Sequence, residues 1–150
     1  MIGRWRRDEG AQSLVEFALV LPVFLMLIFG ILDLARAVWE ENELAFAARE
    51  GTRWAIVHGS SATPQAGPGS VTYSAGPPTT DTGVTTAVTN YTIGIPNVSV
   101  TAAWPDGNNN RNSRVSVDVT ADFVPLPSQY LLGGALSITL KGGSLLVIQY

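Results

Sequence analysis

The chain of 150 residues contains no cysteine and a single histidine, His58. The absence of cysteine excludes disulfides, thiolate metal sites and a cysteine nucleophile. A lone histidine just past the end of an expected helix is far more often structural or solvated than catalytic. The sequence also lacks a serine nucleophile elbow, a phosphate-binding loop and an HExxH zinc motif. We therefore expect a protein with no enzymatic activity and no cofactor.

Charge is scarce as well, because charged residues make up 14% of the chain and the net charge is −3. This balance gives no long-range attraction to nucleic acid, which is therefore not an expected partner. The short basic cluster of Arg4, Arg6 and Arg7 stands directly before an apolar run. Hydrophobic residues make up 46% of the chain and gather in its first third. The length allows one domain and one membrane segment.

The apolar run extends from Leu14 to Leu32 and contains one charged residue, Glu16. A bilayer core about 30 Å thick needs roughly 20 helical residues, so this run can span a membrane. Asp33 and Arg36 close it on the far side. The positive-inside rule places the N-terminus in the cytoplasm and the rest outside. The prediction is a single-pass protein of the cytoplasmic membrane.

Two other interpretations of this run stay open. A cleavable signal peptide finds a possible site at Ala35-Arg36-Ala37, which predicts a secreted domain released after Ala37. Against it, the run exceeds the roughly 7–15 apolar residues usual in signal peptides. The other alternative is a plain anchor that tethers a monomeric extracytoplasmic binding module, with Thr- and Asn-rich loops that recognise a ligand.

Glu16 and Pro22 are the unusual residues of the run. A carboxylate at the edge of an apolar helix is costly, so Glu16 is a functional candidate unless it simply lies at headgroup depth. Pro22 removes a backbone hydrogen bond and crowds the preceding turn, which predicts loosening near residues 18–21.

Helical character is expected to continue to about residue 57, because no proline occurs between Val23 and Pro64. A helix over residues 12–57 is about 70 Å long. Its outer part carries a stripe of mostly small side chains, which let a sheet or another backbone approach closely. The residues of this stripe are Ala37, Leu44, Ala48, Gly51 and Ala55.

The remaining residues predict a small sheet. Residues 98–104 and 115–123 alternate between apolar and polar side chains, and a turn-rich loop joins them as a hairpin. A third strand is expected over residues 136–150, broken or bulged at Gly142-Gly143. Residues 59–83 predict an irregular connection, and residues 84–91 a short helix capped by Asp81 or Thr82. The fold class is thus α+β, with a long N-terminal transmembrane helix packed on a small antiparallel β-sheet domain.

The hairpin loop places Asp106, Asn108 and Asn110 at the spacing of the first ligands of a calcium loop. Arg111 stands where such a loop needs glycine, and Val117 where it needs an acidic residue. A plain hairpin loop is the expectation.

Three segments of the first third resemble a known family. The segments are GAQSLVEFALVLP (residues 10–22), FGILDLAR (29–36) and AAREGTRWA (47–55). Together they are similar to the TadE-like proteins of tight-adherence pili, over roughly residues 10–57. The resemblance implies a pilin or pseudopilin, a structural and assembly subunit of a type IV-like pilus, with a pilin-like long helix.

The resemblance also implies functional residues. In such proteins a prepilin peptidase cuts after a small residue, so that a glutamate lies fifth in the mature chain. Glu16 is fifth if cleavage follows Ala11 and frees Gln12, and sixth if cleavage follows Gly10. Glu16, Phe17 and Pro22 are then the residues of subunit assembly, and Ala48, Gly51 and Ala55 those of helix packing.

The expected partners are other pilin subunits in a homo- or hetero-oligomeric filament, the prepilin peptidase with the pilus assembly platform, and the membrane. The expected organisation is a cytoplasmic basic leader (1–11), a transmembrane helix (12–36), its extramembrane continuation (37–58) and a small extracytoplasmic β-rich domain (59–150). Once assembled, the subunit is expected in an extracellular filament.

Overall fold

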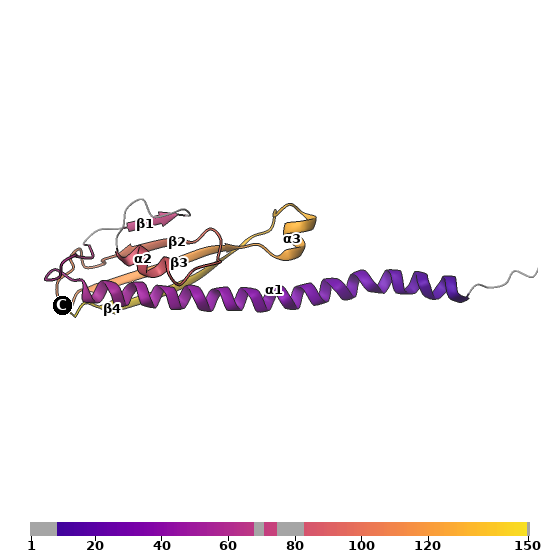
Figure 1. Ribbon diagram of the computed structural model, residues 1–150, viewed down its shortest axis with the longest axis horizontal. Coiled ribbons are helices and arrows are strands. Elements are labelled where there is room, and N and C mark those ends of the chain that lie inside the picture. The colour runs from indigo at the N-terminus through magenta and orange to yellow at the C-terminus, as the bar shows by residue number, and fades with distance from the viewer. Residues whose placement is uncertain (1–8, 68–70, 75–82, 150) are drawn as a thin grey trace, which may run out of the picture.

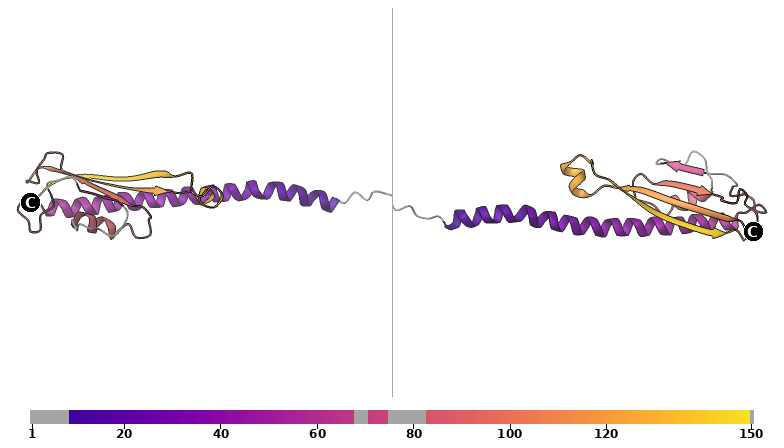
Figure 2. Two further views of the ribbon diagram at one scale, coloured as in Figure 1. Left: turned by 90° about the horizontal axis from the view of Figure 1, so that it is seen from above. Right: turned by 180° about the vertical axis from the view of Figure 1, so that it is seen from behind.

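The computed structural model describes residues 9–67, 71–74 and 83–149. One long helix, α1 (Glu9–Val57), runs along a four-stranded sheet with its C-terminal half and projects beyond it with its N-terminal half (Figure 1). The views from above and behind show the same separation into a bare helical half and a half joined to the sheet (Figure 2). The predicted α+β fold, a long N-terminal apolar helix on a small antiparallel sheet, is confirmed.

Helix α1 continues without interruption through Pro22 and contains 49 residues. At 1.5 Å per residue its length is about 74 Å. It begins three residues before the predicted start at residue 12 and ends at the predicted residue 57. One continuous helix therefore joins the apolar run to the sheet.

The sheet consists of β1 (Val71–Ser74), β2 (Ser99–Ala103), β3 (Arg114–Phe123) and β4 (Ile138–Val147), in that spatial order. All neighbouring strands are antiparallel. The strict alternation along β3 buries every second side chain, as the sequence predicts. The predicted hairpin corresponds to β2 and β3.

The core lies between α1 and the inner face of the sheet. Leu44 and Ala48 on α1 and Val115, Val117 and Val119 on β3 are fully buried. A short helix, α2 (Gly83–Thr89), packs beside α1 and adds Val84 and Val88 to this cluster. Helix α2 confirms the short helix predicted over residues 84–91, whereas its predicted caps Asp81 and Thr82 lie outside the described residues.

Two predictions about the strands were wrong. Residues 71–74, expected in an irregular connection, form β1 and pair with β2. The third predicted strand is neither broken nor bulged, because Gly142 and Gly143 pair in register with Val119 and Asp118. Instead of bending the strand, Gly142 lies against the backbone of α1, where a Cβ atom would overlap Leu44 and Ala45. The glycine permits helix and sheet to approach.

A second short helix, α3 (Leu126–Leu131), interrupts the connection between β3 and β4. It was not predicted from the sequence. It lies above the point where α1 leaves the sheet, far from α2 (Figure 1).

Candidate functional site

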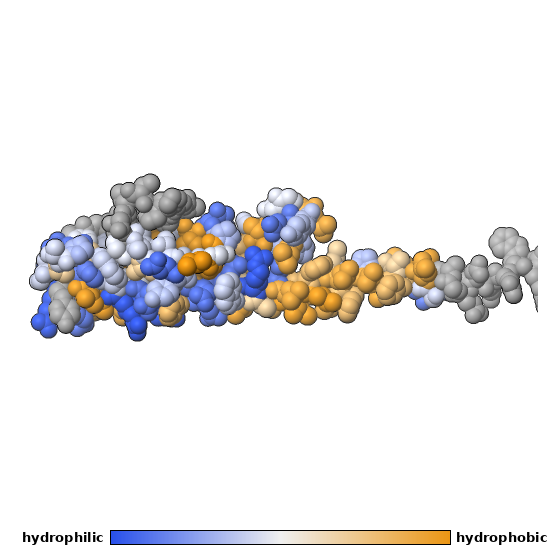
Figure 3. Space-filling model, in the orientation of Figure 1, coloured by the Kyte–Doolittle hydropathy of each residue, from blue (hydrophilic) through white to orange (hydrophobic). Residues whose placement is uncertain are grey.

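The N-terminal half of α1 is a bare apolar surface, and it is the main candidate for function. None of its most apolar 18-residue stretch is buried, and among the described residues α1 is the one helix long and apolar enough to cross a membrane. Figure 3 shows this surface as a continuous apolar band outside the mostly hydrophilic sheet domain. Exposing so much apolar area to water is unfavourable, so a bilayer or other proteins must cover it. This arrangement suggests membrane anchoring.

The residues predicted for assembly all lie on this bare half. Glu16 is exposed, and Phe17 exposes 64% of its surface. Pro22 lines a groove between α1 and α3. The structure therefore groups Glu16, Phe17 and Pro22 on one helix but brings none of them to the sheet.

The predicted cleavage residues stand at the very start of α1. Gly10, Ala11 and Gln12 belong to its first helical residues, and the preceding leader, residues 1–8, lies outside the described part of the chain. In this structure both candidate bonds, after Gly10 and after Ala11, are therefore within the helix.

Asp33 joins α1 to α3, a role that the sequence analysis missed. Its side chain is nearly buried, and both carboxylate oxygens accept a hydrogen bond from the backbone N–H of Leu126, at 3.1 and 3.0 Å. Leu126 is the first residue of α3, whose N–H groups lack partners within the helix. A carboxylate is favourable at this helix end because the helix dipole is positive there.

Arg36 and Glu40 continue the same junction toward the sheet. Arg36 Nε donates to Glu40 Oε1 at 3.2 Å, and its guanidinium lies 4.9 Å from the centre of the Phe123 ring. Glu40 is 3% exposed, so the arginine gives a buried carboxylate the partner that it needs. The charges after the apolar run thus connect α1 to the end of β3.

The predicted packing residues face the core. Ala48 and Ala55 are fully buried. A Cβ atom on Gly51 would stand 2.6 Å from Val88 Cγ2 and 3.3 Å from Val117 Cγ1, closer than carbon atoms normally approach. The small side chains allow α2 and β3 to approach α1 together.

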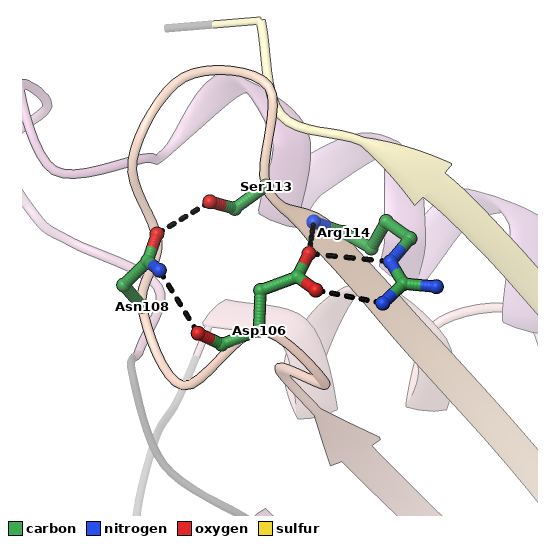
Figure 4. A network of polar contacts seen from close by, with 4 residues as sticks. All are labelled: Asp106, Asn108, Ser113 and Arg114. Atoms are coloured by element: carbon green, nitrogen blue, oxygen red, sulfur yellow. Dashed lines mark hydrogen bonds and ion pairs between the residues drawn. The ribbon is translucent and has the colours of Figure 1, made fainter.

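The loop between β2 and β3 is held by polar contacts at its base (Figure 4). Asp106 accepts hydrogen bonds from the backbone N–H of Arg114 at 2.8 Å and from its guanidinium at 2.7 and 3.2 Å. Asn108 Oδ1 accepts from the backbone N–H of Asn110 and from Ser113 Oγ. The hydrogen bonds and charge of Arg114 lower the pKa of Asp106 to about 2.

The same contacts bear on the calcium-like spacing of this loop. The Asp106 carboxylate and the Asn108 side-chain oxygen, which a cation would need, already have partners within the loop. In the described ranges, no group of three or more His, Asp and Glu side chains is placed to hold a metal ion.

His58 stacks on Trp54, with ring centroids 3.8 Å apart, and its Nδ1 lies 2.8 Å from the Trp54 carbonyl oxygen. These contacts close the C-terminal end of α1. Both rings border an open hollow of about 490 Å³ that also contacts Tyr91 on the segment after α2. The hollow is also lined by Glu50, whose carboxylate pairs with Arg53 at 3.1 Å.

Comparison with known proteins concerns α1. Residues 11–53 match the family model described as TadE-like protein, and no curated protein or solved structure matches the chain. The matched residues lie entirely within α1 and include Glu16, Pro22 and Asp33. The match confirms the resemblance and suggests a protein associated with a tight-adherence pilus. Over residues 11–53, this chain is similar to the TadE-like proteins.

Proposed function

We propose that this chain is a pilin or pseudopilin, a structural and assembly subunit of a tight-adherence pilus. The observation that supports this most strongly is the difference between the two halves of α1. Its apolar N-terminal half is bare, while its C-terminal half is the spine of a folded sheet domain. Tethering alone does not require one helix shared between both parts, whereas a subunit that moves from membrane to filament needs its domain fixed to the apolar helix.

In the membrane-held state, residues 12–36 cross the bilayer, residues 37–58 continue the helix and residues 59–150 remain outside. Basic residues 1–11 stay in the cytoplasm until the prepilin peptidase removes them. In the filament, the surface that contacted lipid packs against α1 of other subunits. The assembly platform transfers the subunit from one environment to the other.

Glu16 sets the axial register in this proposal. An unpaired carboxylate in an apolar helical bundle is costly, and so is an unpaired ammonium group. Cleavage after Ala11 frees the α-amine of Gln12, which can pair with Glu16 of a neighbouring subunit. Phe17 and Pro22 shape the surface beside this pair. Ala48, Gly51 and Ala55 keep the sheet domain close against its own helix.

The substitution Glu16→Ala tests this role in cells that assemble the pilus. We expect the variant to insert into the membrane at the normal level but to be lost from sheared filaments. Glu41→Ala is the matched control, because Glu41 is an exposed glutamate on the sheet-bearing half of the same helix. Normal incorporation of Glu16→Ala would show that Glu16 does not set the register.

The intact mass and N-terminal sequence of the mature protein test the processing step. A start at Gln12 or Ala11 supports the pilin assignment, whereas a start at Val38 indicates a signal peptide. An uncut, monomeric membrane protein without filaments would favour the alternative, a membrane-anchored binding module.

A further inference from the structure

The connection between β3 and β4, residues 124–137, forms a projecting apolar hairpin that contains α3; we name it the α3 hairpin. No Asp, Glu, Lys, Arg or His occurs from Phe123 to Leu140. Its large apolar side chains point outward instead of into a core: Tyr130 is 79% exposed, Leu131 71% and Leu132 56%. A soluble loop of this composition would expose apolar surface to water at a cost.

The α3 hairpin lies at the level of the apolar run of α1. A groove of about 420 Å³, with an almost entirely apolar lining, separates Pro22, Met26 and Phe29 on α1 from Pro127, Tyr130 and Leu131 on the hairpin. Along the helix axis, Phe29 and Pro22 lie about 6 and about 16 Å before Asp33. A bilayer that covers Leu14–Leu32 therefore reaches the hairpin as well.

Several backbone groups of the α3 hairpin have hydrogen-bond partners within it or on α1, which lowers the cost of contact with lipid. Leu126 donates its N–H to Asp33, and Leu132 and Gly134 donate theirs to the Ser128 carbonyl oxygen. Ser128 Oγ donates to the Leu136 carbonyl oxygen and accepts from the Leu136 N–H. Pro125 and Pro127 have no N–H to satisfy.

We propose that the α3 hairpin is a second membrane contact, which inserts Tyr130, Leu131 and Leu132 into the outer leaflet of the bilayer while the subunit awaits assembly. The inference rests on the proposed membrane anchoring of α1. Leucines at the tip contact acyl chains, and a tyrosine is suited to the boundary with the headgroups. The groove between hairpin and α1 is then filled by lipid chains. Two membrane contacts then restrict how α1 and its sheet domain tilt together relative to the bilayer.

The absence of cysteine makes a direct test possible with the full chain. Single variants Leu131→Cys, Val20→Cys and Leu145→Cys are labelled with a small fluorophore and reconstituted into phosphatidylcholine–phosphatidylglycerol vesicles. Val20 reports on the membrane-spanning half of α1. Leu145 is the matched control, an exposed leucine on β4 outside the hairpin. Quenchers carried on lipid acyl chains are compared with aqueous iodide.

We expect acyl-chain quenchers to act on positions 131 and 20 alike, and iodide to act on position 145 alone. If iodide reaches position 131 while position 20 stays in lipid, the hairpin inference fails and the anchoring of α1 stands. If iodide also reaches position 20, both fail. Protection of position 131 from both quenchers would show that a second copy of the chain covers it, which overturns the lipid contact. Leu132→Cys gives the same comparison if Leu131→Cys does not fold.

Discussion

Asp33 is the residue that fixes the α3 hairpin to α1. Its carboxylate accepts the N–H of Leu126, 93 positions away in the sequence, from a nearly buried position. Removing the acceptor leaves a partly buried N–H group without a partner, which is more costly than the bond itself is worth.

We therefore expect Asp33→Ala to lower the free energy of unfolding by about 1–3 kcal/mol. Denaturant unfolding of the full chain in detergent micelles, followed by tryptophan fluorescence, measures the change. Glu41→Ala, at an exposed position on the same helix, should alter it by less than about 0.5 kcal/mol. Equal losses in the two variants would contradict a specific role for Asp33.

Asp106 and Arg114 form the other residue-scale contact with a measurable consequence. Pairing lowers the pKa of Asp106 from 3.8 to about 2. Because the folded-state pKa lies below the unfolded value, the pairing favours the folded state above about pH 4. This contribution is lost as the pH falls toward 2.

In an NMR titration of the Asp106 carboxyl carbon, we expect a midpoint near pH 2 in the native chain. Arg114→Gln removes the guanidinium, the largest cause of the shift, and should raise the pKa toward 3.8. Arg111→Gln, an exposed neighbour in the same loop, should leave it near 2. A midpoint that Arg114→Gln does not move would mean that the ion pair does not persist in solution.

At the scale of elements, the close contact between α1 and β4 depends on Gly142, which has no side chain. Gly142→Ala places a Cβ atom into the helix backbone at Leu44 and Ala45, which cannot move without shifting the whole helix. Overpacking of this kind typically costs about 1–3 kcal/mol, and we expect a loss in that range.

Gly143→Ala is the natural control for that experiment. Its Cβ would meet only Asp118 Oδ1 at 2.8 Å, and this exposed side chain can rotate away. Thermal unfolding monitored by circular dichroism compares the two variants. A control as destabilised as Gly142→Ala would show that the strand, and not the helix contact, imposes the glycine.

At the scale of the whole molecule, the folded core and the proposed membrane anchor use different halves of α1. The buried apolar core begins at Leu44, and none of the most apolar stretch of α1 contributes to it. A chain reduced to residues 33–150 keeps Asp33 and every core residue.

We expect this shortened chain to fold as a water-soluble monomer with the native circular dichroism spectrum of its sheet. The full chain should require detergent. Gel filtration and circular dichroism of both proteins make the comparison. A shortened chain without the native circular dichroism spectrum would show that the bare half of α1 also supports the fold.

The elements that the sequence predicts well are long, and their apolar and polar residues alternate with a single regular spacing. Helix α1 combines a long proline-free stretch with a stripe of small residues, and β3 alternates over its full length. Strand β1 has four residues and α3 has six, too few to establish a period. The Pro-Leu-Pro segment at residues 125–127 was the available indication of α3, because proline is favoured in a first helical turn.

The candidate site also has features that the local sequence predicts and others that it does not. A bare apolar surface is predictable because the absence of charge is a local property of residues 17–32. The partners of Asp33 and Gly142 are distant in the sequence, so no local pattern reveals them. The Gly142-Gly143 pair led to the wrong prediction of a broken strand. A glycine can either bend a strand or leave room for a neighbouring helix, and the sequence alone does not tell these two roles apart.

Because α1 is one continuous helix, a shift of its N-terminal end along the axis moves its C-terminal end as well. From Glu16 to Ala55 the helix spans about 59 Å and is continuous through Pro22. If the Glu16 end of α1 shifts by one helical turn along the axis, the sheet domain at the other end shifts by the same distance, about 5.4 Å. In the proposed filament, the position of each sheet domain along the axis is therefore set by the contacts of Glu16 at the opposite end of the helix.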